Sequence, residues 1–363
     1  FKDAEIAYGS NAVRLTLRHW LMAGVVLLLF YVGMPSLWRV LEPLEIGPDY
    51  RVPYALSDDY WLYERFAGAA LADANAIPIV GDSVVWGQYV APGQTLAQAL
   101  NTECARQFVN LGLNGGHPVA LEGLIRHFGN AVNHRKVVLH FNPLWMTSKR
   151  RDLQAARAGD FNHPQLVPQV YPRIPSYEAS IAERLSSVMR CRIPFLAWTA
   201  HLRSVYFGNR GLPEWTLSHP YSNVLREVTL QVPAPETAPP SEPQAWTQKD
   251  IRPTAFDWVQ PEESIQWAHF QQLVLLLRGR GNDLFVVMGP FNEHMVAEAN
   301  REEYHELRAQ ALAWLEAGDI AHLAPALLPS DLYADASHPL AAGYAALARE
   351  LAASAPFQAF VGK

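Results

Sequence analysis

Residues 76–87 read AIPIVGDSVVWG. Residues 76–80 form a short apolar run that stops at Gly81, which is typical of a buried strand. Asp82 and Ser83 follow at once, so polar side chains come directly after the strand. In open α/β sheets the carboxyl ends of the strands border the ligand crevice. This stretch therefore predicts an α/β fold with reactive side chains at the edge of its sheet.

Similar apolar runs alternate with helical patterns along much of the chain. We expect further strands at 107–113, 136–141, 283–288 and 320–324. The spacing of apolar residues predicts helices at 95–107, 118–130, 262–278, 301–317 and 339–353. Apolar strands that alternate with helices predict a parallel sheet covered on both faces.

The alternation breaks at about 143–260, which we interpret as an insertion in one domain that covers residues 76–363. The insertion holds a predicted helix pair near 177–208 and the stretch QVPAPETAPPSEP at 231–243. The latter has five prolines in thirteen residues, so it is predicted to be a loop or tether. Residues 193–207, IPFLAWTAHLRSVYF, fit a core helix or, alternatively, a surface that faces a membrane or a partner.

Residues 19–38, HWLMAGVVLLLFYVGMPSLW, contain no Asp, Glu, Lys or Arg. Twenty helical residues reach roughly 30 Å, the thickness of a bilayer core. Trp20, Tyr31 and Trp38 suit interfacial positions. We predict a transmembrane anchor here, with a buried core helix as the alternative, followed by a linker and short helix at 39–75. A cleaved signal peptide is disfavoured because no small-residue cleavage site follows the apolar stretch.

The flanking charges predict the orientation of this anchor. Lys2, Arg14 and Arg18 precede it, whereas only Arg39 follows closely before three acidic residues. Basic flanks stay on the cytoplasmic side, so residues 1–18 are predicted to be cytoplasmic. The domain would then lie in the periplasm or outside the cell, anchored in the cytoplasmic membrane.

Composition excludes several functional classes. Half of the chain is hydrophobic and 18% is charged, which excludes a disordered chain. The net charge is −6, from 29 basic and 35 acidic residues, and a mildly acidic protein is a poor binder of nucleic acid. Cys104 and Cys191 are two separate thiols or, in an oxidising compartment, one disulfide. The histidines show no metal-ligand spacing backed by carboxylates, so we expect no metal and no cofactor.

Three residues have the chemistry of an activated serine nucleophile. Ser83 follows the first strand, while Asp335 and His338 lie in DASHP just before the last predicted helix. His338 would take the proton of Ser83, and Asp335 would orient the imidazole. Pro339 fits the first position of that helix, which would hold His338 in the flanking loop.

Other polar residues near predicted strand ends suit supporting roles. The Ser83 N–H, the Gly112 N–H and the Asn142 amide are candidate oxyanion donors. Asp82 is expected to fix the turn beside Ser83. Candidates for substrate contact, with loop hydrogen bonding as the alternative, are Asn114, His117, Asn292, Glu293 and His294.

The motifs resemble those of the SGNH (GDSL-type) hydrolase superfamily. The resembling blocks are Ser83 in IVGDSVVWG, Gly112 in NLG, Asn142 in VVLHFN, and Asp335 and His338 in DASHPLAAGY. The resemblance covers roughly residues 76–142 and 283–353. It implies a flavodoxin-like three-layer fold and serine-dependent ester chemistry without a metal. The family usually has Gly two residues before the third-block Asn, whereas this chain has His140.

Three functional hypotheses remain open. The first is an O-acyltransferase of the cell envelope that acts on an extracytoplasmic glycan, because anchored members of the superfamily resemble partners of multi-pass membrane acyltransferases. The second is an esterase that removes acyl groups from a glycan or lipid. The third is a non-catalytic subunit of an envelope complex, which a complete triad disfavours.

Overall fold

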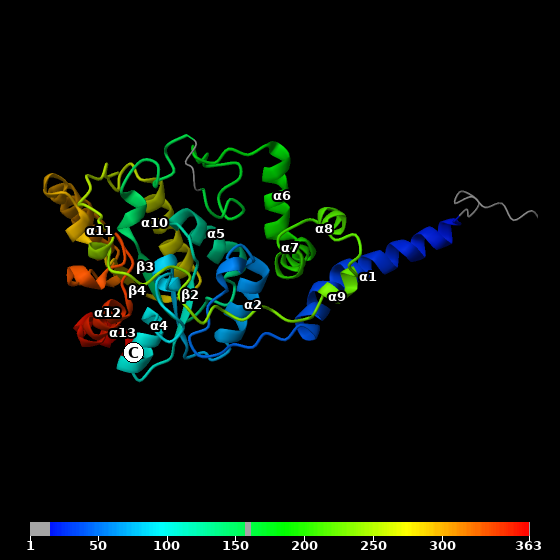
Figure 1. The fold of residues 1–363 in the computed structure, drawn as a ribbon, viewed down its shortest axis with the longest axis horizontal. Coiled ribbons are helices and arrows are strands. Elements are labelled where there is room, and N and C mark those ends of the chain that lie inside the picture. The colour runs from blue at the N-terminus through cyan, green and yellow to red at the C-terminus, as the bar shows by residue number, and fades with distance from the viewer. Residues whose placement is uncertain (1–14, 157–160, 363) are drawn as a thin grey trace, which may run out of the picture.

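The structure, a computed structural model, describes residues 15–156 and 161–362. Lys2 and Arg14, used above for the orientation, lie outside the described residues. A five-stranded parallel sheet forms the centre (Figure 1), with the strands β1 (Ile77–Gly81), β2 (Phe108–Gly112), β3 (Lys136–Phe141), β4 (Asp283–Met288) and β5 (Ala321–Leu323). The strand order is β2-β1-β3-β4-β5. The predicted parallel sheet is confirmed, and β3 and β4 have the predicted bounds.

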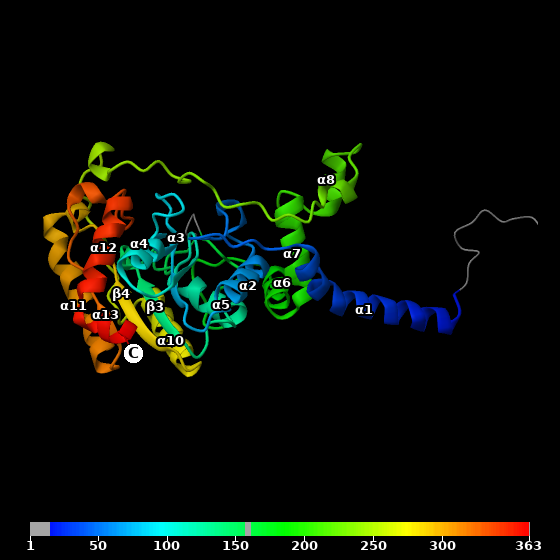
Figure 2. The same cartoon turned by 90° about the horizontal axis from the view of Figure 1, so that it is seen from below.

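Helices cover both faces of this sheet (Figure 2). Their bounds are α2 (Tyr60–Ala70), α3 (Ser83–Trp86), α4 (Leu96–Glu103), α5 (Pro118–Phe128), α10 (Ile265–Gly279), α11 (Arg301–Ala317), α12 (Ala341–Ala353) and α13 (Ala355–Gly362). Because side chains alternate along a strand, Ile79 and Phe285 pack with α4, α12 and α13. Val80 and Val286 point the other way and pack with α2, α5, α10 and α11. Short 3-10 helices lie at Tyr54–Leu56, Pro143–Met146, Trp246–Gln248, Glu293–Met295, Glu298–Asn300 and Ser330–Leu332.

The last long helix begins later than predicted. α12 starts at Ala341, so the prediction that Pro339 takes the first helical position is wrong. Pro339 instead forms an antiparallel bridge with Tyr333. The N–H of Ala334 donates to the carbonyl of His338 at 2.8 Å. A hairpin, rather than a helix start, therefore holds His338.

In its described part, the insertion contains the predicted helix pair and two further α-helices. They are α6 (Ile181–Arg192), α7 (Pro194–Tyr206), α8 (Leu212–Ser218) and α9 (Val224–Glu227). Residues 231–243 form no helix or strand, as predicted, and run along the outside of the domain (Figure 2). Two hydrogen bonds fix this tether: Tyr54 N–H to Glu236 at 2.8 Å, and the Gln88 amide to Ser241 at 3.2 Å.

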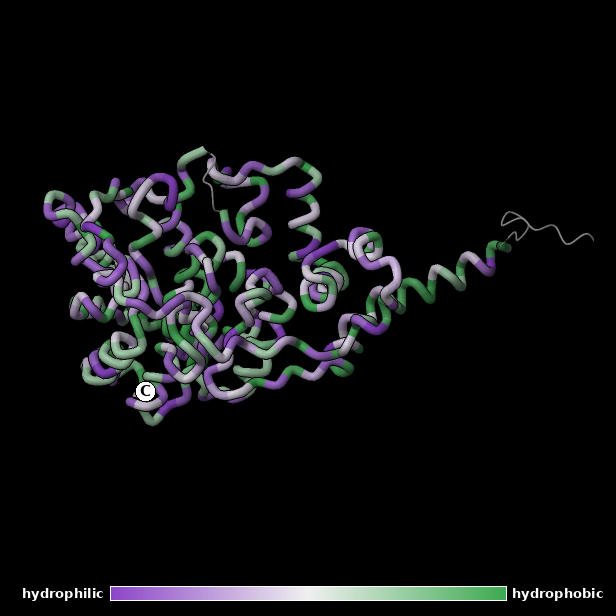
Figure 3. The backbone as a smooth tube through the Cα atoms, viewed as in Figure 1, coloured by the Kyte–Doolittle hydropathy of each residue, from purple (hydrophilic) through white to green (hydrophobic). Residues whose placement is uncertain are grey.

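Near the N-terminus, α1 (Leu17–Leu41) is 25 residues long. It is long and apolar enough to cross a membrane. The helix projects from the domain (Figures 1 and 2) and is strongly hydrophobic along much of its length (Figure 3). Its buried residues, Pro35 and Trp38, lie toward the domain end, so most of its apolar surface has no protein cover.

A buried polar cluster joins the end of α1 to the domain. His201 of α7 contacts Glu42 at 3.0 Å through Nε2 and Asp59 at 2.6 Å through Nδ1. Arg65 and Tyr206 also donate to the Glu42 carboxylate. Burial raises the pKa of Glu42, but its cationic and hydroxyl partners outweigh burial and lower that pKa to about 2. Burial lowers the pKa of His201, and the two carboxylates outweigh it, giving about 9.

Candidate active site

The candidate site lies where the strand order of the sheet reverses. From β1 the chain goes to β2 on one side, and β3 then adds on the other side of β1. Such a point leaves a crevice at the carboxyl ends of the strands. Ser83 begins α3 directly after β1, and Asp82 caps that helix by accepting from the Val84 N–H at 3.0 Å. The end of β3 places Asn142 at the same edge.

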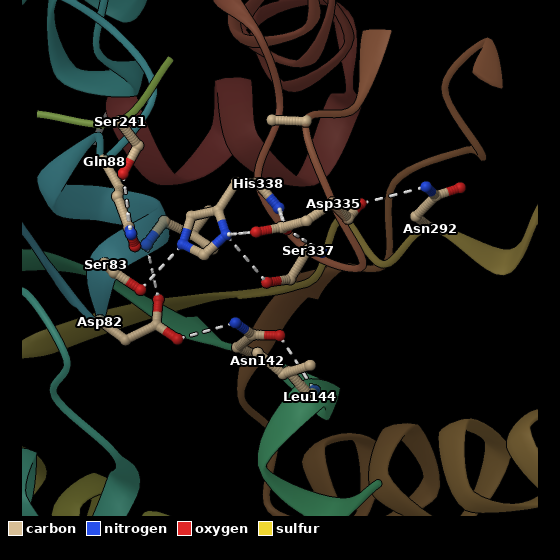
Figure 4. A network of polar contacts seen from close by, with 12 residues as sticks. Asp82, Ser83, Gln88, Asn142, Leu144, Ser241, Asn292, Asp335, Ser337 and His338 are labelled. Carbon is tan, nitrogen blue, oxygen red and sulfur yellow. Dashed lines mark hydrogen bonds and ion pairs between the residues drawn. The ribbon is translucent and has the colours of Figure 1, made fainter. Parts of the chain in front are cut away.

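The three predicted catalytic residues form one hydrogen-bonded chain (Figure 4). His338 Nε2 lies 2.9 Å from Ser83 Oγ. His338 Nδ1 lies 2.9 Å from each carboxylate oxygen of Asp335. A proton on Nδ1 donates to this carboxylate, so the lone pair of Nε2 faces the Ser83 hydroxyl. This is the arrangement in which an imidazole accepts the proton of a serine nucleophile.

The hairpin around Asp335 holds its carboxylate in place. Asp335 Oδ1 accepts from the N–H groups of Ser337 and His338, both at 2.9 Å. Asn292 donates from its amide to the Asp335 carbonyl at 3.1 Å. Burial raises the pKa of Asp335, but the His338 imidazole and these hydrogen bonds bring it well below its usual range. The carboxylate is therefore charged at neutral pH.

The charged Asp335 in turn acts on His338. Burial lowers the pKa of His338, but the carboxylates of Asp335 and Asp82 outweigh burial and raise that pKa above its ordinary value. The side chains of Ser83 and His338 are both almost fully buried. The imidazole is thus poised to take up a proton in a site with little exposure to water.

Asp82 organises the neighbouring amide. The Asn142 amide donates to Asp82 Oδ2 at 2.8 Å, and Trp145 Nε1 donates to the same oxygen at 2.9 Å. The side-chain oxygen Oδ1 of Asn142 accepts from the Leu144 N–H at 3.0 Å. An amide nitrogen has two hydrogens, so one N–H of Asn142 remains for a ligand. Asp82 thus fixes the turn, as expected, and also orients Asn142.

The expectation for Gly112 needs correction. Its N–H donates to the side chain of Asn110 at 3.0 Å, so it is not a free oxyanion donor. A Cβ on Gly112 would lie 2.3 Å from the backbone nitrogen of Trp86. Glycine is therefore required so that β2 can approach the backbone of α3, the helix that carries Ser83.

Asn292, Glu293 and His294, the candidates in the loop after β4, form contacts within the protein. Asn292 is fully buried and supports the Asp335 loop. Glu293 pairs with His305 at 3.0 Å, and His294 Nε2 lies 3.0 Å from the Leu328 carbonyl. The structure therefore favours the alternative of loop hydrogen bonding over substrate contact for this group.

The two candidates after β2 have similar surroundings. His117 caps α5 by accepting from the Ala120 N–H at 3.3 Å, and its Nε2 lies 3.1 Å from the Asn162 carbonyl. Burial lowers the pKa of His117 to about 3, so it is neutral. The Asn114 carbonyl contacts His163 Nε2 at 2.8 Å. His117 is thus a structural residue, and the backbone of Asn114 is tied to the insertion.

His140 replaces the glycine that the family pattern has. It is buried in β3, and its Nδ1 lies 3.4 Å from Asp82 Oδ1. Apart from this longer contact, neither ring nitrogen meets a hydrogen-bond partner among residues 15–156 and 161–362. A Cβ on Gly81 would lie 2.9 Å from the Cβ of His140. The larger residue in β3 is accommodated because the facing position in β1 is glycine.

Two residues beside the triad were missed in the sequence. The Tyr89 ring lies 5.3 Å from the His338 ring. Lys249 Nζ lies 4.9 Å from the centroid of Tyr89 and donates to the Ala334 carbonyl at 3.0 Å. Burial and the Asp335 carboxylate raise the pKa of Tyr89 to about 12. Lys249 follows the tether, and no motif marks it.

Within residues 15–156 and 161–362, no group of three or more His, Cys, Asp or Glu side chains is arranged to hold a metal ion. Cys104 and Cys191 are free, half-buried thiols that pack against different apolar clusters.

No protein-family model matches this chain. No curated protein matches it in sequence either.

Proposed function

We propose that this protein is a serine-dependent acyl-ester enzyme of the SGNH (GDSL-type) kind. The observation that carries the proposal is the hydrogen-bonded chain from Asp335 through His338 to Ser83, with 2.9 Å at each link. Ser83 and His338 lie 255 residues apart in the sequence, so a local turn or helix cap does not account for their contact.

The reaction begins with attack by Ser83 Oγ on the carbonyl carbon of an acyl ester. His338 Nε2 accepts the hydroxyl proton, and Asp335 stabilises the imidazolium. His338 then returns the proton to the leaving alkoxide as the ester C–O bond breaks, which leaves an acyl-Ser83 ester. A second hydroxyl compound loses its proton to His338 and attacks the carbonyl carbon of this ester. His338 then returns the proton to Ser83 Oγ as the acyl–Oγ bond breaks, which restores the free serine.

The negative oxygen of each tetrahedral intermediate needs fixed donors. The Ser83 N–H belongs to the first turn of α3, where backbone N–H groups have no partner within the helix. The second N–H of Asn142 is the other donor, since Asp82 and the Leu144 N–H fix the amide. We therefore assign the oxyanion site to Ser83 and Asn142, without Gly112.

The fold supports the same family. The strand order β2-β1-β3-β4-β5 is the flavodoxin-like order, in which ligands bind at the switch point between β1 and β3. Ser83 and Asn142 follow these two strands. Helices on both faces of the sheet give the three layers that the resemblance implies.

The acceptor that we propose is a hydroxyl group of a glycan outside the cytoplasm. The apolar helix α1 supports membrane anchoring, and the basic residues before it favour a cytoplasmic N-terminus. A multi-pass membrane acyltransferase is the proposed source of the acyl group. If water replaces the sugar hydroxyl, the same triad is an esterase.

A burst experiment with p-nitrophenyl acetate tests the shared chemistry. We expect detergent-solubilised protein to release nitrophenolate in a burst stoichiometric with enzyme and to accumulate acetyl-Ser83. Ser83→Ala should abolish the burst. The matched control is Ser337→Ala, since Ser337 also lies in the site but contacts His338 Nδ1, at 3.5 Å. A burst that survives in Ser83→Ala contradicts the proposal. Fast turnover without added acceptor favours the esterase.

A further inference from the structure

The insertion packs against the membrane helix well inside its apolar length. The ring of Phe195, at the start of α7, lies 4.6 Å from Tyr31 and 6.1 Å from Phe30. Trp198, one turn later, contacts Phe30 at 6.5 Å and Trp38 at 5.6 Å. The start of α7 therefore lies beside the middle of α1 rather than at its end.

These contacts determine how deep Phe195 lies in a bilayer that α1 spans. The helix rises about 12 Å from residue 30 to residue 38, where the uncharged stretch ends. A bilayer core is about 30 Å thick, so half of it is about 15 Å. Any placement that covers residues 19–38 with lipid puts the ring of Phe195 inside the leaflet on the domain side.

The chain around Phe195 has the side chains that such a depth requires. We call residues 188–196, the end of α6 and the start of α7, the α6–α7 corner. Val188 and Met189 are 39% and 41% exposed, and Pro194 is exposed as well. Apolar side chains at this corner would face water if no lipid were present.

Two arginines in the corner complete the pattern. Arg190 and Arg192 end α6, and neither forms an ion pair with a carboxylate in the described part of the chain. The Arg190 Nε is buried without a hydrogen-bond partner. Long cationic side chains next to apolar ones reach from the hydrocarbon boundary to lipid phosphates.

We infer that the α6–α7 corner is seated in the lipid leaflet from which α1 emerges on the domain side. The occupant is lipid because the corner is continuous with α1, whose side chains at the same level stay exposed, including Leu29 at 67% and Val32 at 65%. The domain is then held to the bilayer at two adjoining points, α1 and the corner. The inference rests on the proposed membrane anchoring and is independent of the serine chemistry.

Depth-dependent quenching on the full-length protein tests this inference. Single cysteines replace Met189 or Val188 in a background of Cys104→Ser and Cys191→Ser, and each is labelled with the fluorophore NBD. The protein is reconstituted in phosphatidylcholine vesicles that contain doxyl-labelled lipid. Val26→Cys, at a position 64% exposed on α1, is the positive control. Leu327→Cys, at a position 42% exposed, is the matched negative control. The N–H of its neighbour Ala326 donates to Glu350 of α12, a helix that lies away from α1 (Figures 1 and 2).

We expect blue-shifted emission and strong quenching at 188 and 189, approaching those at 26, with neither at 327. Quenching at 26 but not at 188 and 189 contradicts the insertion of the α6–α7 corner in lipid, while it still supports the membrane anchoring of α1. Absence of quenching at all positions contradicts both the membrane anchoring of α1 and the insertion of the corner. Equal quenching at 327 shows unspecific adsorption and also contradicts the insertion of the corner. Circular dichroism and the unfolding temperature verify that each variant is folded. The burst assay reports separately on the proposed chemistry.

Discussion

At the scale of single residues, Asp335 determines the charge state of His338. The carboxylate accepts from Nδ1 and raises the pKa of an imidazole that burial alone would lower. Only the neutral imidazole is a base, so the rate of Ser83 acylation should rise with pH through this pKa. The midpoint should lie above the ordinary histidine value of about 6.5.

Asp335→Asn provides the test of that coupling. Without the Asp335 carboxylate, only Asp82 opposes the effect of burial on the pKa of His338, so the midpoint of the pH profile should move to lower pH. The rate itself should fall by about 10⁴-fold, because the amide favours the wrong tautomer. The pH dependence of inactivation by a fluorophosphonate measures both effects. An unchanged midpoint would show that Asp335 does not control the imidazole.

Asn142→Ala tests the oxyanion assignment. The loss of one donor should raise the barrier by about 3–4 kcal/mol, with little change in binding. The kcat and KM for p-nitrophenyl acetate measure this directly. Gly112→Ala is not a suitable comparison, because its Cβ would collide with the backbone of α3. A kcat close to that of the unchanged protein would remove Asn142 from the site.

The sequence identified the triad residues but not all of their surroundings. Ser83, Asp335 and His338 occur in motifs whose order and context are informative, and the structure brings them together. The role of Gly112 was wrong because its N–H is taken by Asn110, a contact between side chain and backbone that spacing does not reveal. Lys249 was missed because its partner Ala334 is 85 residues away.

At the scale of elements, strands were easier to predict than helix starts. β3 and β4 are buried runs bounded by clear breaks, and both have the predicted bounds. The start of α12 was misplaced because proline at a first helical position and proline in a bridge have the same local sequence. The pairing of Pro339 with Tyr333, which decides between them, depends on tertiary structure.

The junction of α1, α2 and α7 depends on His201. His201→Ala leaves the buried Glu42 and Asp59 without their shared partner, which should cost about 3–5 kcal/mol of unfolding free energy. The folded pKa of about 9 lies above the unfolded value, so this stabilisation is fully present below about pH 6.5. It is lost as the pH rises through the folded pKa.

Denaturant unfolding in detergent at pH 6 and above pH 9 measures this difference. The difference in unfolding free energy between the unchanged protein and His201→Ala should be large at the lower pH and small at the higher pH. His305→Ala is the matched control, because His305 pairs with Glu293 on the surface and should contribute less than about 1 kcal/mol. A gap that does not depend on pH would contradict the charged state of His201.

At the scale of the whole molecule, distant segments complete one site. The nucleophile follows β1 at the start of α3, and the base comes from the hairpin before α12 (Figure 4). Tyr89 lies beside His338, and Lys249 lies over the Tyr89 ring. The path of the tether over the domain was not predictable, since a proline-rich stretch carries no periodic signal. The pattern of strands did, however, predict the edge of the sheet at which these segments meet.

The most direct test of the central claim is to map the site of reaction with a fluorophosphonate on the folded, detergent-solubilised protein. Mass spectrometry of proteolytic fragments should place one adduct on Ser83. The adduct should be absent in Ser83→Ala and His338→Ala, and present in Ser337→Ala. An adduct that persists in Ser83→Ala, or that maps to Ser337, would contradict the assignment of Ser83 as the nucleophile.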